Sequence, residues 1–240
     1  MADPRDRLIV ALDVESLTRA EALLERLEGL VSTFKVGSQL FTAAGPAAVE
    51  LIQKRGGKVF LDLKYHDIPN TVAGAVREAA RLGVAMLTLH ASGGLAMLEA
   101  GAKAAKTAAL EFKLAKPLCL AVTVLTSLDR AALQRELNVP FSVEGQVLHL
   151  AQLAKAAGAD GSVAAPQEIR TLRNGLGREW VIVTPGVRPV GSEAGDQARV
   201  ATPEMVLQAG ADYLVVGRPI TEAADPAKAA LSILEAMATA

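Results

Sequence analysis

The sequence predicts a (β/α)8 barrel in which residues 1–240 form a single domain. Eight short apolar runs rich in Val, Ile and Leu recur along the chain, and Ala/Leu-rich stretches that favour helices separate them. Apolar runs of this kind are typical of parallel strands that helices cover on both faces. No linker-like or low-complexity stretch interrupts the pattern, and about 250 residues is the usual length of one barrel. A doubly wound open sheet is the structural alternative.

The expected strands and helices alternate from the first residues to the last. The strands span Leu8–Val14, Thr33–Gly37, Lys58–Lys64, Met86–Ala91, Leu118–Val124, Gly161–Ala165, Trp180–Gly186 and Tyr213–Arg218. A first helix begins after Ser16, a residue that favours N-caps, and carries an apolar stripe of leucines. Further helices are expected over Ala47–Lys54, Thr71–Leu82, Leu95–Phe112, Val143–Ala157, Pro203–Ala209 and Pro226–Met237. Glycines at 56, 83, 158 and 210 stand where helices would end.

Composition narrows the function classes. Hydrophobic residues make up 51% of the chain and charged residues 21%, which indicates a folded globular protein. The formal net charge is −1, so there is no general attraction to nucleic acid or to an anionic membrane. Aromatic residues are only 3%, which disfavours a base-stacking surface for single-stranded nucleic acid. Any anionic ligand must therefore be held by a few local cations.

Cysteine usage and apolar runs predict a reduced, cytoplasmic protein. Cys119 is the only cysteine, so it can form no internal disulfide and no Cys-rich zinc site. Residues 1–7 have no apolar signal core. The longest uncharged run, Leu82–Leu98, is too short and too interrupted to span a bilayer. We expect no membrane partner.

Charged side chains gather near the carboxyl ends of the expected strands, where barrel enzymes carry out their chemistry. On the third strand, Asp62 and Lys64 share one face because side chains alternate across a strand. Burying such a pair is costly unless the charges are matched. Lys35 and Asp67 add one charge of each sign, and the four groups suit an alternating array that keeps both lysines protonated. We interpret this set as catalytic. The alternative is an ion pair that only lines the barrel.

The last loops indicate a phosphate site. Gly217 and Arg218 close the eighth strand, and barrels often bind phosphate near their seventh and eighth strands. Arg218 supplies a forked donor with a permanent charge. The long polar segment Arg188–Thr202 suits a lid over that phosphate, although an ordinary flexible loop would look similar.

The sequence gives little support for a metal site or for a Ser-His-Asp catalytic triad. Asp62 and Asp67 are the best candidates for Mg²⁺, but a lysine on the same face competes with a cation. The three histidines form no metal-ligand spacing, and no Ser-His-Asp signature is present. We therefore expect no metal site.

The block Asp62–Thr71 closely resembles the signature of the orotidine 5′-phosphate decarboxylase family, and the bacterial form is the most similar. Further blocks resemble that family in order along nearly the whole chain: Ala11–Asp13, Phe34–Gly37, His90–Gly94, Val122–Ser127, Thr184–Pro189, Gly195–Arg199 and Val216–Ile220. The resemblance implies decarboxylation of orotidine 5′-monophosphate to UMP and CO2 in pyrimidine biosynthesis. It implies neither metal nor organic cofactor.

The resemblance also implies residue roles. Lys64 would donate the proton to C6 of the pyrimidine. Lys35, Asp62 and Asp67 would complete the charged network, with Asp67 coming from the other subunit of a homodimer with shared active sites. The expected substrate contacts are Asp13 and Lys35 at the ribose, Thr71 of the partner beside them, Thr126 and Ser127 at the pyrimidine, Gln197, Gly217 and Arg218 at the phosphate, and Arg188 at the lid.

Two other functions stay open at this point. A related metal-dependent decarboxylase or aldolase acting on a sugar phosphate shares the Asp-x-Lys-x-x-Asp pattern, but the blocks around Thr126 and Gln197 argue against it. A non-catalytic nucleotide-binding barrel is the alternative from another class. The intact set of Lys35, Asp62, Lys64 and Asp67 argues against that one.

Overall fold

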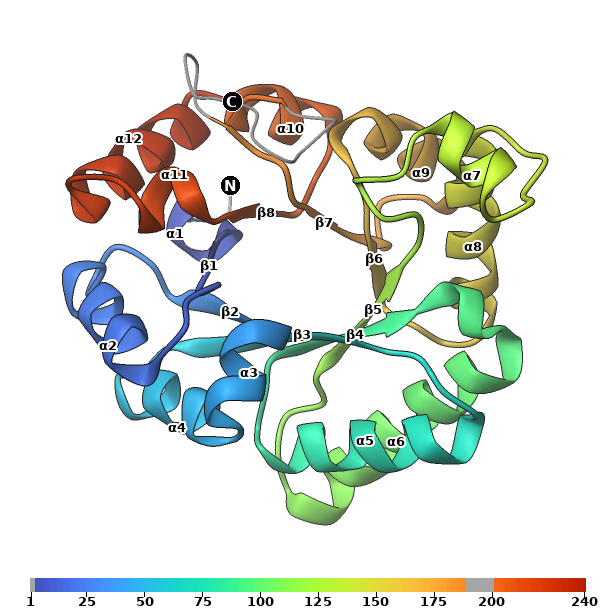
Figure 1. Ribbon diagram of the computed structural model, residues 1–240, viewed down its shortest axis with the longest axis horizontal. Helices are drawn as coiled ribbons and strands as arrows, with labels where there is room; N and C mark the ends of the chain where they lie inside the picture. Colours follow the sequence, from blue (N-terminus) through green and yellow to red (C-terminus); the bar gives the residue numbers. More distant parts are fainter. Residues whose placement is uncertain (1–2, 189–200) are drawn as a thin grey trace.

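A computed structural model describes residues 3–188 and 201–240, and in it eight parallel strands close into a barrel (Figure 1). The strands are β1 (Leu8–Ala11), β2 (Thr33–Gly37), β3 (Lys58–Tyr65), β4 (Met86–His90), β5 (Leu118–Val122), β6 (Gly161–Val163), β7 (Val181–Thr184) and β8 (Tyr213–Val216). Each strand pairs with the next one along the chain, and β8 closes the ring on β1, with Val216 beside Val10. The (β/α)8 barrel is confirmed, and the doubly wound open sheet was the wrong alternative.

All eight expected strands are present, but most end earlier than the sequence pattern indicated. The first strand ends at Ala11, although the apolar run continues to Val14. Residues beyond the rim of the barrel turn into loops that lead to helices, and they have no neighbouring strand to pair with. Val14 and Val124 are nevertheless buried, which explains why the apolar pattern ran on.

Helices surround the barrel as an outer ring (Figure 1). The helices of the described residues are α1 (Pro4–Arg7), α2 (Leu17–Arg26), α3 (Ser38–Ala44), α4 (Ala47–Lys54), α5 (Pro69–Arg81), α6 (Leu95–Phe112), α7 (Arg130–Arg135), α8 (Val143–Ala156), α9 (Ile169–Leu176), α10 (Pro203–Ala209), α11 (Arg218–Thr221) and α12 (Pro226–Ala238). Ser16 caps α2 as expected, because its hydroxyl accepts a hydrogen bond from the backbone N–H of Arg19. The sequence pattern missed α1, α3, α7, α9 and α11, which are all eight residues or shorter.

Two apolar layers hold the fold together. The smaller one fills the inside of the barrel and consists of Ile9, Ala11, Phe60, Met86, Leu120, Val183 and Val215. The larger one lies between the strands and the helices, and it includes Val10, Leu61, Leu87 and Cys119. Neighbours such as Phe60 and Leu61 belong to different layers because side chains alternate across a strand.

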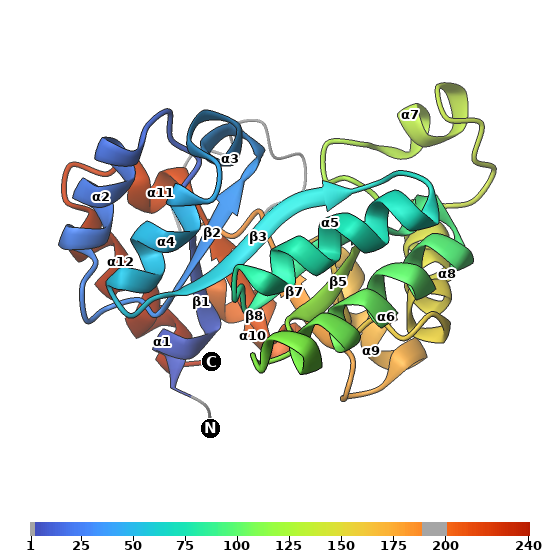
Figure 2. The ribbon, with the colours of Figure 1, turned by 90° about the horizontal axis from the view of Figure 1, so that it is seen from below.

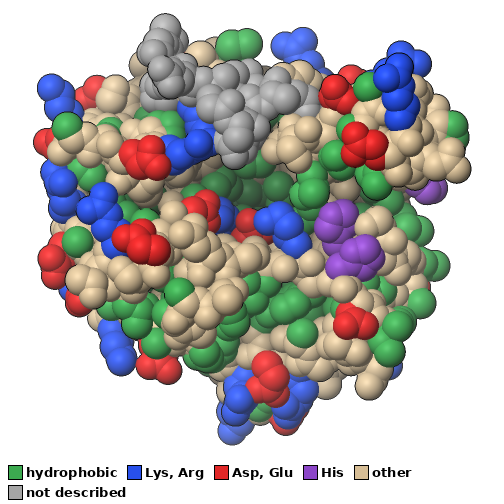
Figure 3. Space-filling view, in the orientation of Figure 1, with side chains coloured by type: hydrophobic (Ala, Val, Ile, Leu, Met, Phe, Trp, Pro, Cys, Tyr) green, Lys and Arg blue, Asp and Glu red, His purple; other side chains and the backbone are tan. Residues whose placement is uncertain are grey.

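The two rims of the barrel differ in character. Acidic and basic side chains lie together in a hollow near the centre of the rim formed by the carboxyl ends of the strands (Figure 3). Figure 2 shows α7 projecting at this rim, whereas α1 and the C-terminal end of the chain lie at the opposite rim.

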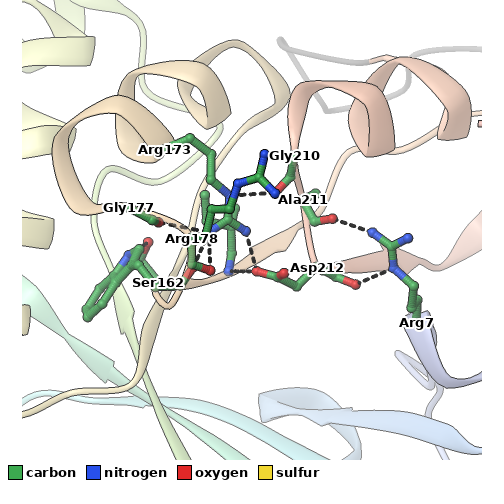
Figure 4. A network of polar contacts seen from close by, with 10 residues as sticks. Arg7, Ser162, Arg173, Gly177, Arg178, Gly210, Ala211 and Asp212 are labelled. Atoms are coloured by element: carbon green, nitrogen blue, oxygen red, sulfur yellow. Dashed lines mark hydrogen bonds and ion pairs between the residues drawn. The ribbon is translucent and has the colours of Figure 1, made fainter. Parts of the chain in front are cut away.

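A network of hydrogen bonds and one ion pair around Arg173 and Asp212 connects the segments at the opposite rim (Figure 4). The Arg173 guanidinium is ion-paired with Asp212, whose carboxylate also accepts the backbone N–H of Ile182. Arg173 donates further hydrogen bonds to the carbonyls of Gly177, Arg178, Trp180 and Gly210, and Arg7 donates to those of Ala211 and Asp212. These groups precede β7, β8 and β1, so the network stabilises the barrel away from the charged hollow.

Among the described residues, no helix is both long enough and apolar enough to cross a membrane.

Candidate active site

A cavity of about 470 Å³ opens at the carboxyl ends of the strands. Its lining includes residues from β1, β2, β3, β5, β6 and β8 and from the loops that follow β1, β5, β7 and β8. Predicted site residues that line it are Asp13, Lys35, Asp62, Lys64, Thr126, Arg188, Gly217 and Arg218. The fold therefore brings together eight side chains or backbone positions that are up to 205 residues apart in the chain.

Four of these residues form one continuous chain of alternating charges. The ammonium nitrogen of Lys35 lies 2.8 Å from Oδ1 of Asp13 and 3.7 Å from Oδ2 of Asp62. The ammonium nitrogen of Lys64 lies 2.9 Å from the same Oδ2 of Asp62. The side chains of Lys35 and Asp62 are only 10% and 12% exposed, so each lysine offsets the desolvation of a carboxylate and each carboxylate that of a lysine. The order along the chain of charges is Asp13, Lys35, Asp62, Lys64.

Lys64 projects from a distorted part of β3. Its φ angle is 51°, in the left-handed region that residues other than glycine seldom adopt. The pairing of β3 with β4 shifts register here, because Leu61 lies beside Leu87 but Tyr65 lies beside Leu89. Bulges of this kind re-aim side chains and are common beside active sites. The distortion presents the Lys64 ammonium group to the cavity next to Asp62.

Thr88 on β4 is a site residue that sequence reasoning missed. Its fully buried hydroxyl accepts a hydrogen bond from the backbone N–H of Lys64 at 2.9 Å and donates one to Oδ1 of Asp62 at 3.0 Å. In the sequence it stands within the apolar run Met86–Leu89. A signal was present, because Thr88 is two residues from Met86 and therefore faces the inside of the barrel.

The cationic end of the cavity is built from the loop that follows β7 and from the start of α11, which follows β8. Arg188 and Arg218 both line it. Burial lowers the pKa of the Arg188 guanidinium, and the nearby charge of Arg218 lowers it further. Two guanidinium groups that line the same end of the cavity suit an anionic ligand. The predicted phosphate residue Gln197 lies outside the described residues.

Three predicted site residues do not line the cavity. Asp67 is exposed, and its Oδ1 accepts a hydrogen bond of 2.6 Å from the backbone N–H of Ile68. Thr71, on the first turns of α5, and Ser127, beside Thr126, are exposed as well. Asp67 instead lines a separate shallow hollow together with His66, Ile68, Pro69, Ser92 and Gly93.

Two histidines lie stacked beside that hollow. The ring centroids of His66 and His90 are 5.2 Å apart, and Nδ1 of His90 lies 2.7 Å from the hydroxyl of Ser92. Burial lowers the pKa of His90, with smaller contributions from the positive charges of His66 and Lys64. This shift favours the neutral form of the His90 ring.

Within residues 3–188 and 201–240, no group of three or more His, Cys, Asp or Glu side chains has the arrangement of a metal site. The cavity instead offers ammonium and guanidinium groups to a ligand. Its four cationic side chains exceed its three carboxylates by one, so it suits an anionic molecule.

Comparison with known proteins identifies the family. The model of the orotidine 5′-phosphate decarboxylase / HUMPS family matches residues 6–233. The chain belongs to this family. Among curated relatives, the orotidine 5′-phosphate decarboxylase of Moorella thermoacetica is 57% identical over 95% of this chain and 91% of its own length. The orotidine 5′-phosphate decarboxylase of Syntrophotalea carbinolica is 51% identical over all of this chain and 98% of its own.

Solved structures of this decarboxylase family share the fold. The crystal structure of orotidine 5′-phosphate decarboxylase from Lactobacillus acidophilus superposes with a TM-score of 0.84 and is 37% identical, covering 97% of this chain and 99% of that one. The enzyme from Pyrococcus horikoshii, at 23% identity and a TM-score of 0.75 over 96% of this chain and 99% of that one, shows a likeness of fold alone.

Proposed function

We propose that this member of the family decarboxylates orotidine 5′-monophosphate to UMP and CO2, a step of pyrimidine biosynthesis. The observation that carries the proposal is the chain of charges from Asp13 to Lys64, which opens onto a cavity with Arg188 and Arg218 among its other lining residues. A nucleoside monophosphate has matching parts: a ring with a reacting carbon, a ribose with two hydroxyls and a dianionic phosphate.

Lys64 carries the central chemical role in this proposal. When the bond between C6 and the carboxylate breaks, its electron pair stays on C6 as CO2 leaves. The pyrimidine ring delocalises that pair poorly, so a fixed ammonium group beside C6 stabilises the developing charge. The ammonium group then transfers a proton to C6, and Lys64 is left neutral until it is reprotonated from solvent. Asp62, 2.9 Å from the ammonium nitrogen, holds it in place.

The other predicted site residues bind the parts of the substrate that do not react. Asp13 and Lys35 bind the ribose hydroxyls, and Thr126 with the adjacent Ser127 binds the edge of the pyrimidine. We assign Gly217, Arg218 and Gln197 to the phosphate, and Arg188 to the lid. Binding energy from the phosphate is available to offset the cost of ordering the site around the reacting carbon.

A homodimer would complete each site. Asp67 and Thr71 are exposed and lie outside the cavity of their own chain, as residues that serve a neighbouring site must be. Ile68, between them, is 68% exposed and offers an apolar side chain for contact with a partner subunit. We assign Asp67 to the charged network of the partner's site and Thr71 to the partner's ribose subsite.

We also place the enzyme in the cytoplasm. The single cysteine, Cys119, is buried, and burial raises the pKa of its thiol to about 12. A buried thiol of this kind behaves as a small apolar side chain and requires no oxidising compartment.

The direct test is an ultraviolet assay of the purified chain with orotidine 5′-monophosphate, followed by chromatographic identification of UMP. We expect turnover that persists in excess EDTA. Turnover of a sugar phosphate that EDTA abolishes, with none of the nucleotide, would instead support the metal-dependent decarboxylase or aldolase. Binding of UMP without turnover of either substrate would support the non-catalytic barrel.

A further inference from the structure

We propose that Thr88 is the positioning residue of the decarboxylase site, because its one hydroxyl group sets both the backbone of Lys64 and the carboxylate that holds the Lys64 ammonium group. The proposal rests on the function proposed above. It concerns a residue that does not line the cavity and therefore acts only through Lys64 and Asp62.

The geometry of the β3–β4 pairing gives Thr88 this place. Leu61 lies beside Leu87 and Tyr65 beside Leu89, so three residues of β3, 62–64, face the single residue Thr88 of β4. The backbone N–H of Lys64 is bonded to the Thr88 side chain. In a regular parallel sheet, a backbone carbonyl of β4 would accept this hydrogen bond, and here the Thr88 hydroxyl accepts it instead. Without it, the half-buried bulge would leave this N–H without its partner, which is costly.

The direction of both hydrogen bonds follows from the groups involved. A backbone N–H can only donate, so the Thr88 oxygen accepts from Lys64. An ionised carboxylate can only accept, so the one hydroxyl hydrogen is donated to Oδ1 of Asp62. The hydroxyl thus has a single arrangement that satisfies both neighbours. Serine can reproduce it, whereas valine has the same shape but neither the donor nor the acceptor.

Because of the hydrogen bond from Thr88, the two oxygens of the Asp62 carboxylate have different partners. Oδ1 is taken by Thr88, which leaves Oδ2 for the ammonium groups of Lys64 at 2.9 Å and Lys35 at 3.7 Å. If the carboxylate rotated, Oδ2 would leave both lysines. Thr88 therefore fixes Lys64 twice, once at its backbone and once at the counter-ion of its ammonium group.

The test compares Thr88→Val with Thr88→Ser and with a matched control. Thr123→Val removes another buried hydroxyl, one that donates to the carbonyl of Val163 and touches neither Asp62 nor Lys64. We expect Thr88→Val to lower kcat by about tenfold or more with KM changed less than about threefold, which is the pattern for an interaction used at the transition state. Thr88→Ser should restore kcat to within about threefold of wild type, and Thr123→Val should leave it within about twofold.

A purely structural role for Thr88 predicts another pattern. Melting temperature would fall in Thr88→Val and Thr123→Val alike, while kcat measured well below melting would stay near wild type in both. That result, or equal loss of kcat in Thr88→Ser and Thr88→Val, would overturn the proposal. Should Thr88→Val fail to fold, Thr88→Ser and Thr88→Cys differ by one atom, and a thiol is a weak donor and acceptor. Equal kcat in those two variants would overturn the proposal as well.

The outcome for wild type separates this inference from the function on which it rests. A wild-type chain that does not decarboxylate orotidine 5′-monophosphate overturns both. An active wild type with an unaffected Thr88→Val overturns only the role of Thr88.

Discussion

Gly37 leaves the space that the Asp13 carboxylate occupies. A β-carbon added at Gly37 would lie 2.7 Å from Oδ1 of Asp13 and 3.0 Å from the ammonium nitrogen of Lys35. The backbone of Gly37 is extended, with φ at −93°, so the reason for glycine is space and not conformation. The ion pair between Asp13 and Lys35 therefore requires a residue without a side chain at position 37, the last residue of β2.

Gly37→Ala should reduce activity while keeping the barrel folded. The added methyl group must push the Asp13 carboxylate away from Lys35. A hydrogen bond between charged groups is worth about 1.5–3 kcal/mol, so we expect a loss of up to roughly ten- to 150-fold in kcat/KM. The measurement is steady-state kinetics together with thermal melting. Unchanged kcat/KM would mean that Asp13 has no required position relative to Lys35.

Lys64→Ala should remove most turnover and keep nucleotide binding. The ammonium group acts mainly on charge that develops as CO2 leaves, and a positioned proton donor contributes about 10²–10⁴-fold to a rate. Kinetics and calorimetric titration with UMP measure the two effects separately. Lys64→Arg should not rescue, because a planar guanidinium does not release a proton readily. Near-native kcat in pure Lys64→Ala would refute the proton-donor role.

Arg218→Ala should weaken recognition of the phosphate. A charge-assisted hydrogen bond is worth about 1.5–3 kcal/mol, which corresponds to roughly a ten- to hundredfold loss in kcat/KM for the nucleotide. Orotidine, which lacks the phosphate, is the matched substrate control and should be affected far less. Equal losses on both substrates would place the phosphate elsewhere and leave Arg218 with a structural role.

Mixing two inactive variants tests the shared site. Lys64→Ala and Asp67→Ala homodimers should both be nearly inactive, since each site needs Lys64 of one chain and Asp67 of the other. In a mixed dimer, one site carries both changes and the other carries neither. Random exchange of equal amounts makes half of the dimers mixed, so activity should recover to about a quarter of wild type.

Verified mixed dimers that stay inactive would contradict this arrangement. Asp67 would then serve the site of its own chain, or it would serve the fold rather than the chemistry.

His90 should make the protein less stable in mild acid. Burial lowers the pKa of His90 in the folded state, so the unfolded chain binds the proton more readily and stability falls as pH drops through the ordinary histidine range near 6.5. Melting curves at pH 7.5 and 5.5 should therefore show a smaller drop for His90→Gln than for wild type. An equal drop in both proteins would show that His90 does not contribute to the pH dependence.

Much of the fold, and the direction in which Asp62 points, could be predicted from local sequence patterns. Apolar runs separated by amphipathic stretches predicted eight strands in the right order, and Thr33–Gly37 matches β2 at both ends. Alternation of side chains correctly placed Asp62 inside the barrel and Leu61 outside it. These features depend on residues that are neighbours along the chain, so the chain itself displays them.

What only the tertiary structure decided is how strands distant in sequence meet. The left-handed backbone of Lys64 and the two hydrogen bonds of Thr88 exist because β3 and β4 pair with shifted register, and no pattern within either strand records that shift. The exposure of Asp67 likewise depends on where the folded chain ends β3 and begins α5, because Asp67 lies between them. The physical reason is the same in both cases. Charges and hydrogen bonds act over a few ångströms in space, and folding alone brings these groups within that range.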